Sequence, residues 1–292
     1  MEKTRRASLM LMAAMFIFGT LSPFVRNISV SSGELALYRA ILATVLIGSY
    51  LLITGQSIDL RSIKKELLLL TVSGAAMGFN WILLFEAYKY TTVSVATLSY
   101  YFAPVIVTAA CPLLFKEKLT GKQIICFVMS TIGLVLITGI GGNEPNGTHH
   151  IGILYGLGAA CLYASVVLMN KFIKNVAGIH RTFLQFLAVI LVLIPYVALT
   201  GGVSLNTMSP TGWVCLLVVG LVHTGVTYCL YFSSLRDLPG QKAAILSYID
   251  PLVAVLISVT VLGETMTPVQ VLGGGLILGF TLWNELPARE RK

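Results

Sequence analysis

The sequence predicts an all-α membrane protein in which ten transmembrane helices form two inverted five-helix repeats. Three observations predict this fold. The composition is 56% hydrophobic and only 11% charged, with a mean hydropathy of +0.86. The chain contains ten apolar runs of spanning length, and one pattern recurs 147 residues later. Soluble domains carry about 25% charged residues, so this composition excludes a soluble protein.

The ten apolar runs are the predicted spans. Each is close to the roughly 20 residues that a helix needs to cross the hydrocarbon core. The loops between them are short and rich in Gly, Asn, Ser and Pro, which leaves no room for a separate soluble domain. The predicted spans are residues 7–28, 34–54, 66–87, 93–115, 122–140, 152–172, 181–200, 211–233, 241–262 and 268–285.

The basic residues predict the orientation of the chain. The net charge is +8, but its placement indicates membrane topology rather than nucleic-acid binding. If the chain crosses ten times, 17 of the 20 Lys and Arg residues fall on one side. Lys and Arg are retained on the cytoplasmic side, so both termini are predicted to be cytoplasmic, in a multi-pass protein of the cell membrane.

The repeat appears when the sequence is compared with itself at a shift of 147 residues. Among the matched pairs are Phe85 and Phe232, Lys89 and Arg236, Tyr101 and Tyr248, Pro104 and Pro251, and Glu117 and Glu264. Each half holds five helices, and because five is odd the second copy enters the membrane from the opposite face. The predicted units are residues 1–140, an extracytoplasmic connector 141–150, and residues 151–292. Inverted repeats are typical of secondary transporters, which hold their sites near the midplane.

Three features carry a resemblance to a known family. They are the duplicated five-helix unit, the motifs FGTLSPFVR and ALYRAILA, and the paired segments LSYYFAPVIVTAACPLLFKEKLT and LSYIDPLVAVLISVTVLGETMT. On these features the chain resembles the drug/metabolite transporter superfamily in its EamA-type branch. The resemblance implies a cavity lined by the first, third, fourth, sixth, eighth and ninth helices. One departure is Phe18, where many relatives have Trp.

Pro104 and Pro251 predict matched interruptions of the fourth and ninth helices. Proline removes one backbone hydrogen bond and clashes with the carbonyl four residues earlier. In lipid, a freed carbonyl needs a neighbour or a watery cavity. A corresponding pair of broken helices in two halves is the best sequence indication of a transport site. The alternative is a pair of kinks that serve packing alone.

Asp250 is the sharpest functional candidate. A charged side chain at mid-bilayer costs about 2.5–3.5 kcal/mol on insertion scales. Its repeat mate is Ala103, so the duplicated fold does not itself require a carboxylate. We expect Asp250 to bind a substrate ammonium or to exchange a proton. The alternative is a structural pair with Arg39 or a backbone donor, and Arg39 could also extend to the membrane interface.

Further candidates share helix faces with these residues. Ser247, Asp250 and Pro251 form one helical stripe, and His223, Thr227 and Tyr231 recur every four residues. His223 is a second candidate for proton coupling, with a helix–helix hydrogen bond as the alternative. Glu117 and Glu264 are expected to cap the helices that follow them. The predicted substrate-binding residues are Asn80, Trp81, Tyr100, Tyr101, Tyr163, Thr227, Tyr228, Ser247, Tyr248 and Asp250.

These observations predict a secondary active transporter that exports small polar metabolites, amino acids or related amines, by alternating access. One alternative is an importer of an organic cation such as a quaternary amine. An alternative of another class is a non-transporting membrane receptor or assembly factor. The sequence has no Walker A, GxSxG or HExxH motif, so we expect no enzyme activity, cofactor or metal. The expected partners are a small-molecule substrate, a proton and the bilayer, with no nucleic acid, in a monomer or homodimer.

Overall fold

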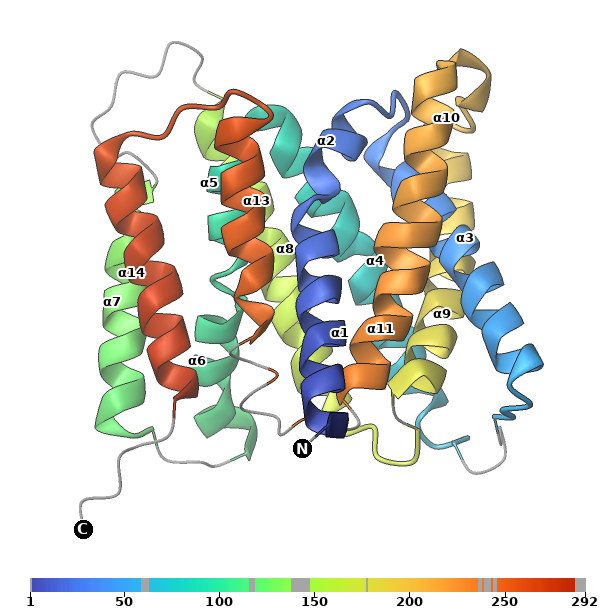
Figure 1. The fold of residues 1–292 in the computed structure, drawn as a ribbon, viewed down its shortest axis with the longest axis horizontal. Helices are drawn as coiled ribbons and strands as arrows, with labels where there is room; N and C mark the ends of the chain where they lie inside the picture. The colour runs from blue at the N-terminus through green and yellow to red at the C-terminus, as the bar shows by residue number, and fades with distance from the viewer. Residues whose placement is uncertain are drawn as a thin grey trace.

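The computed structural model describes residues 2–58, 63–115, 119–137, 148–176, 178–235, 238, 243 and 246–286. These residues form a helical bundle without a strand among them (Figure 1). In chain order the elements are α1 (Glu2–Gly19), α2 (Leu21–Arg26), α3 (Ser32–Ile53), α4 (Leu67–Tyr90), α5 (Val93–Tyr100), α6 (Ala103–Phe115), α7 (Gly121–Ile137), α8 (His149–Asn170), α9 (Gly178–Thr200), the 3₁₀ helix η1 (Leu205–Thr207), α10 (Pro210–Leu217), the π-helix η2 (Val218–Val226), α11 (Thr227–Leu235), α13 (Ile249–Thr260) and α14 (Pro268–Glu285).

The helices confirm an all-α, multi-pass membrane protein. Within the described ranges, seven helical stretches are long and apolar enough to cross a membrane, and α7 and α13 are shorter apolar helices. α13 is short because it begins only after a break in the ninth predicted span, and α7 borders residues outside the described ranges. The number of ten passages therefore stays a prediction. Most of the predicted connector, residues 141–147, lies outside the described residues.

Corresponding helices of the two halves run in opposite directions. α1 begins and α14 ends at one end of the bundle, which we call the terminal end (Figure 1). α8, the counterpart of α1, begins at the opposite end, which we call the far end. There His149 Nδ1 lies 2.7 Å from Thr91 Oγ1, next to the C-terminal end of α4. The packing of α8 beside α4 thus joins the two halves.

α7 and α14 show a reciprocal contact. A Cβ atom on Gly133 would lie 2.6 Å from the carbonyl oxygen of Gly273, and one on Gly273 would lie 2.6 Å from that of Gly133. The neighbours match as well, because Ile277 and Ile137 each approach the opposite position at 3.0 Å. Small residues allow helices to approach closely in lipid. Equal contacts in both directions between antiparallel helices give local two-fold symmetry, as expected for two inverted copies (Figure 1).

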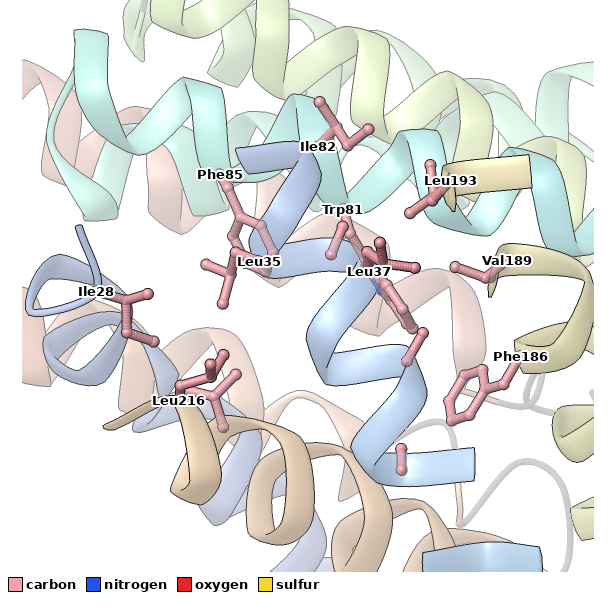
Figure 2. Close-up of a cluster of buried hydrophobic side chains, with 14 of the residues drawn as sticks. Ile28, Leu35, Leu37, Trp81, Ile82, Phe85, Phe186, Val189, Leu193 and Leu216 are labelled. Atoms are coloured by element: carbon pink, nitrogen blue, oxygen red, sulfur yellow. The ribbon is translucent and has the colours of Figure 1, made fainter. Parts of the chain in front are cut away.

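The main hydrophobic core packs α3, α4 and α9 against α10 (Figure 2). Such contiguous apolar contacts hold helices in a fixed arrangement. The labelled members of this core are Ile28, Leu35, Leu37, Trp81, Ile82, Phe85, Phe186, Val189, Leu193 and Leu216, all under a tenth exposed. Trp81 stands at the edge of the core, where it also lines the central cavity described below.

The fourth and ninth predicted spans are both interrupted beside their prolines. α5 ends at Tyr100 and α6 begins at Ala103, and the amide of Phe102 bonds the carbonyl of Ser99 at 3.2 Å in a tight turn. In the second half a turn at Tyr248 precedes α13, and Pro251 occupies the first turn of that helix. Proline is tolerated in a first helical turn because its missing N–H would have no partner there. The two breaks therefore correspond.

The eighth predicted span departs from a continuous α-helix, because its middle, η2, is π-helical. Two hydroxyl groups bond carbonyls five residues earlier: Thr224 Oγ1 to Val219 O at 2.8 Å and Thr227 Oγ1 to Val222 O at 2.7 Å. π-helical turns are rare and occur often at functional sites. This wider turn changes which side chains of the span face inward.

Candidate substrate cavity

A cavity of about 480 Å³ lies between the two halves of the bundle. Ligand-binding pockets commonly measure about 300–1,000 Å³. The wall contains residues from all six helices that the resemblance implied. It also contains Arg39 from α3, and Thr182 and Gln185 from α9, so the second and seventh predicted spans contribute as well.

Asp250 faces this cavity and bonds across the two halves. The hydroxyl of Tyr101, at the break between α5 and α6, donates to Asp250 Oδ2 at 2.5 Å. Asp250 is half-buried on the wall. An ion pair between Asp250 and Arg39, one of the sequence-based alternatives, is wrong, because the described ion pairs are Arg26–Glu264 and Lys89–Glu86. The carboxylate therefore meets a neutral donor from the opposite repeat.

Most of the predicted substrate-binding residues lie on the cavity wall. Those on the wall are Trp81, Tyr100, Tyr101, Tyr163, Tyr228, Ser247, Tyr248 and Asp250, together with Pro104. Pro251, the mate of Pro104, is buried in α13 and is not part of the wall. The two breaks are therefore equivalent in backbone but not in what they present to the cavity.

Asn80 and Thr227 do not reach the wall, contrary to the sequence-based expectation. Asn80 Nδ2 donates to the carbonyl of Ala159 in α8 at 2.6 Å, and Thr227 bonds within its own π-helical turn. Both side chains are buried. They are repeat mates, so the same face of each helix is used for packing, while their neighbours Trp81 and Tyr228 face the cavity.

His223 also lies away from the cavity wall. Its Nε2 atom is 3.2 Å from Thr20 Oγ1, and its ring lies 4.9 Å from that of Phe24. It is 2% exposed. This placement matches the helix–helix hydrogen bond that was the alternative to proton coupling.

Aromatic rings form much of the wall between the polar groups. The ring of Tyr100 lies 5.7 Å from that of Tyr101 and 5.5 Å from that of Tyr163, and Phe18 lies 5.3 Å from Tyr228. Edge-to-face and tilted arrangements at these distances are favourable for aromatic pairs. Tyr163 is 41% exposed although it lines the cavity, so the described residues do not fully enclose its ring.

The cavity extends toward the terminal end of the bundle. Its wall includes Asn170 at the end of α8, Thr182 near the start of α9 and Leu235 at the end of α11. Gln185 Nε2 donates to Asn170 Oδ1 at 3.0 Å and to Ser73 Oγ at 2.5 Å. These polar residues at helix ends were missed by the sequence analysis, because helix-end polarity is normal in any bundle and carries no signal of its own.

At the far end of the bundle lies a cluster that we call the far-end clasp: Arg26, Val93, Ser94, Ser258 and Glu264. The Glu264 carboxylate pairs with Arg26, accepts from the Ser258 hydroxyl, and accepts from the amide of Val93 at 2.8 Å. Ser94 Oγ donates to Ser258 Oγ at 2.8 Å. The clasp ties α2 and α5 of the first half to α13 of the second.

The expected role of Glu264 as a cap for the next helix is wrong. α14 has its own capping box, made by Thr267 and Gln270. Glu264 instead meets the first turn of α5, a helix of the other repeat, where the helix dipole favours a negative charge. Glu117, its repeat mate, lies outside the described residues.

The sequence profile of the EamA-like transporter family matches the chain twice, over residues 5–139 and 150–284. The chain belongs to the EamA-like transporter family. It is therefore a membrane transporter rather than an enzyme.

Several proteins are similar to this EamA-like transporter along most of its length. It is 30% identical over 268 residues to the uncharacterized transporter YxxF of Bacillus subtilis (strain 168), covering 91% of this chain and 85% of that one. It is 24% identical over 233 residues to the threonine/homoserine exporter RhtA of Escherichia coli (strain K12), covering 79% and 75%. One solved crystal structure shares its fold, with a TM-score of 0.65 at 15% identity and coverage of 94% and 96%.

Gly19 brings the first helix of this EamA-like transporter against the break that carries Asp250. A Cβ atom on Gly19 would lie 2.7 Å from the carbonyl oxygen of Asp250 and 2.6 Å from Val253 Cβ. Carbon atoms do not approach that closely without displacement, so the glycine is required for this contact between α1 and α13. The close approach fixes the backbone from which the Asp250 side chain extends.

The side chains on the cavity wall are of the kinds that line ligand-binding sites. In the part of the chain that the structure describes, no group of three His, Cys, Asp or Glu side chains could hold a metal ion. The charged residue types on the described wall are Arg39 and Asp250, with hydroxyl, amide and aromatic groups around them. Such a wall suits a small polar solute that carries an apolar or aromatic portion.

Proposed function

We propose that this chain is a secondary active transporter that exports amino acids or related amines by alternating access. The proposal includes ten membrane passages, cytoplasmic termini in the cell membrane, and transport units at residues 1–140 and 151–292. Support comes from the double family match, from the bias of basic residues to one side, and from a cavity at the interface of the two halves. The printed name of RhtA, a threonine/homoserine exporter, supports the amino-acid class at 24% identity.

The observation that carries the proposal is the Asp250–Tyr101 hydrogen bond on the cavity wall. An intramembrane carboxylate is retained at a cost of about 2.5–3.5 kcal/mol, and it lies at the corresponding helix breaks where transporters of this architecture hold their solutes. In this mechanism Asp250 receives a substrate ammonium or a proton. The hydroxyl of Tyr101 belongs to the first half of the bundle. A change in what Asp250 binds would therefore alter a hydrogen bond between the two repeats.

The state described by the structure suits one step of such a cycle. The cavity reaches toward the terminal end, and the far-end clasp ties the two halves together at the other end of the bundle. With cytoplasmic termini, this state would load solute from the cytoplasm. Opening of the clasp and closure around Asn170, Thr182 and Leu235 would then release it outside.

Transport into proteoliposomes tests this function with Asp250→Asn as the decisive variant. Purified protein is reconstituted, and uptake of labelled threonine, homoserine and a panel of amines is measured against empty liposomes. We expect Asp250→Asn to lower the rate about tenfold or more, because hydrogen bonds to a charged group contribute about 1.5–3 kcal/mol. Glu86→Gln is the matched control, since Glu86 pairs with Lys89 outside the wall. Unchanged uptake in Asp250→Asn would remove this residue from the mechanism.

The same preparation separates the two roles proposed for Asp250. If it exchanges a proton, a pH gradient drives wild-type accumulation, and Asp250→Asn loses accumulation but retains solute counterflow. If it binds only the substrate ammonium, accumulation and counterflow fall together. Absence of flux for every solute, with a protein that co-purifies, would favour the receptor or assembly-factor alternative.

A further inference from the structure

Arg39 is a buried cation whose charge has no anionic partner among the described residues. It is the eighth residue of α3 and lies about 10 Å along the helix from its far-end start. The side chain is 3% exposed, so it does not extend to the membrane interface. A buried, unpaired charge costs several kcal/mol. Such a charge in a membrane segment is a functional-site hypothesis by default.

The guanidinium is held in place by neutral contacts. Its carbon atom lies 4.2 Å over the centre of the Trp81 ring and 5.4 Å over that of Phe85. Its Nε–H donates to Thr224 Oγ1 at 3.1 Å, and that hydroxyl is positioned by the π-helical turn of η2. A guanidinium has five N–H donors. Within the described ranges, the bond to Thr224 is the one that Arg39 makes, which leaves its two terminal nitrogen atoms available.

Arg39 and Asp250 both lie on the cavity wall, and they do not pair with each other. Tyr88 and Tyr228 lie on the same wall. The described wall thus contains one fixed cation and one fixed anion, in separate places. It complements a solute that carries one anionic and one cationic group and no net charge. A phosphate ester would meet a single arginine and a repelling carboxylate, and an organic cation would be repelled by Arg39.

We propose that Arg39 is the anion-binding residue of the cavity and takes the carboxylate of the transported solute, so that the cavity selects zwitterionic amino acids over the matching amines. This inference rests on the proposed function and adds the second recognition group to it. A guanidinium recognises a carboxylate through two parallel N–H···O bonds. The two terminal nitrogen atoms of Arg39 supply that geometry. Trp81 and Thr224 hold the plane of the guanidinium group in position.

The test uses ligand series that differ only in the carboxylate: leucine, leucinamide and 3-methylbutylamine, and phenylalanine, phenylalaninamide and phenethylamine. Thermal stabilisation of the purified protein and competition with flux are both measured. We expect wild type to favour each acid about tenfold to a hundredfold over its amide and amine, the range of a charge-assisted hydrogen bond. In Arg39→Gln this preference should fall to about twofold, and Arg39→Lys should keep part of it because lysine retains the charge without the planar fork.

Two further variants keep the test decisive. Thr224→Val keeps the charge but removes the hydrogen bond to Nε, and should lower the acid preference severalfold. Lys89→Gln removes one positive charge from an exposed ion pair outside the wall, and should leave it unchanged. A purely structural arginine would lower stability for all ligands equally without changing the ratio of acid to amine.

The outcomes separate this inference from the proposed function. Flux of amino acids with an acid preference that survives in Arg39→Gln would overturn the role of Arg39 and leave the transporter intact. Equal recognition of acids and amines by wild type would do the same and would favour the organic-cation alternative. If no solute moves, the transport proposal fails, while thermal stabilisation by the acids alone still decides what Arg39 binds.

Discussion

The two helix breaks at the cavity share a backbone plan and differ in chemistry. In the first half the break presents Tyr100 and Tyr101 with Pro104, and in the second it presents Ser247, Tyr248 and Asp250. Duplication accounts for the common breaks, since each proline stands at the same repeat position. The carboxylate was placed in one copy alone, where its mate is Ala103. The backbone around the cavity is therefore alike in the two halves, while the carboxylate is present in one half alone. This asymmetry suits a solute with two different ends.

The contact between Tyr101 and Asp250 follows from this chemical difference between the two breaks. Tyr101 of the first break donates to Asp250 of the second, so the two copies meet through a donor from one and an acceptor from the other. The acceptor carboxylate has no counterpart in the first break, where its repeat mate is Ala103. The asymmetry thus turns a packing interface into a bond that responds to what occupies Asp250.

Gly19→Ala tests whether the second break needs the close support of α1, and we expect the largest effect here. The new Cβ atom would lie 2.7 Å from the carbonyl oxygen of Asp250, and overpacking costs about 1–3 kcal/mol. α13 must move and carry Asp250 with it. Transport should fall about tenfold or more, and the thermal midpoint should decrease. The measurements are proteoliposome uptake and a thermal melt of the purified variant.

Gly279→Ala is the matched control for this substitution. Gly279 lies in the interior of α14, and a Cβ atom there would meet nothing within 4 Å. An alanine in a helix is favoured over glycine by about 1 kcal/mol, so stability should hold or rise and uptake should not change. Equal losses in both variants would indicate a general intolerance of larger residues and would contradict a special contact at Asp250.

Tyr101→Phe tests the bond between the two breaks. The substitution removes the hydroxyl that donates to Asp250 and keeps the ring. We expect uptake to fall about tenfold, the effect of one hydrogen bond to a charged acceptor. Tyr163→Phe removes a hydroxyl from the same wall that has no hydrogen bond among the described residues, and should stay within about twofold of wild type. Equal rates for the two variants would show that the bond between the halves does not contribute.

Much of the fold could be predicted because the length of each apolar run and the matched residues of the two repeats can be read directly from the sequence. Runs such as 34–54 and 66–87 became α3 and α4 with boundaries shifted by a few residues. The breaks followed from two prolines, whose effect on the backbone is covalent. What could not be predicted is the π-helical turn of η2, because no residue type in that segment demands it.

Prediction of which side chains reach the cavity wall succeeded for Asp250, Tyr101 and Trp81. It failed where a helix face had to be chosen. Asn80 and Thr227 have the polarity of binding residues, but polar side chains in lipid also serve helix packing, and spacing does not say which neighbour they meet. Arg39 was recognised as unusual, but its contact with Trp81 and its place on the wall depend on the tertiary arrangement.

Glu264→Gln tests the far-end clasp and should give the smallest effect of these variants. The substitution keeps the size of the side chain and removes the charge that attracts Arg26 and favours the first turn of α5. Arg26 is partly exposed, at 38% for its side chain, so solvent weakens the pair, and exposed pairs contribute about 0–1 kcal/mol. We therefore expect a two- to fivefold shift toward states open at the far end.

The measurement is labelling of a cysteine introduced at Thr97, which lies on the wall near the far end. A membrane-impermeant maleimide is added from the far side, in a background in which the native cysteines are replaced. Labelling should be faster in Glu264→Gln and unchanged in Glu86→Gln, which breaks an exposed ion pair within one helix. If Glu264→Gln leaves labelling at the control rate, the clasp is a structural contact that takes no part in closing the far end.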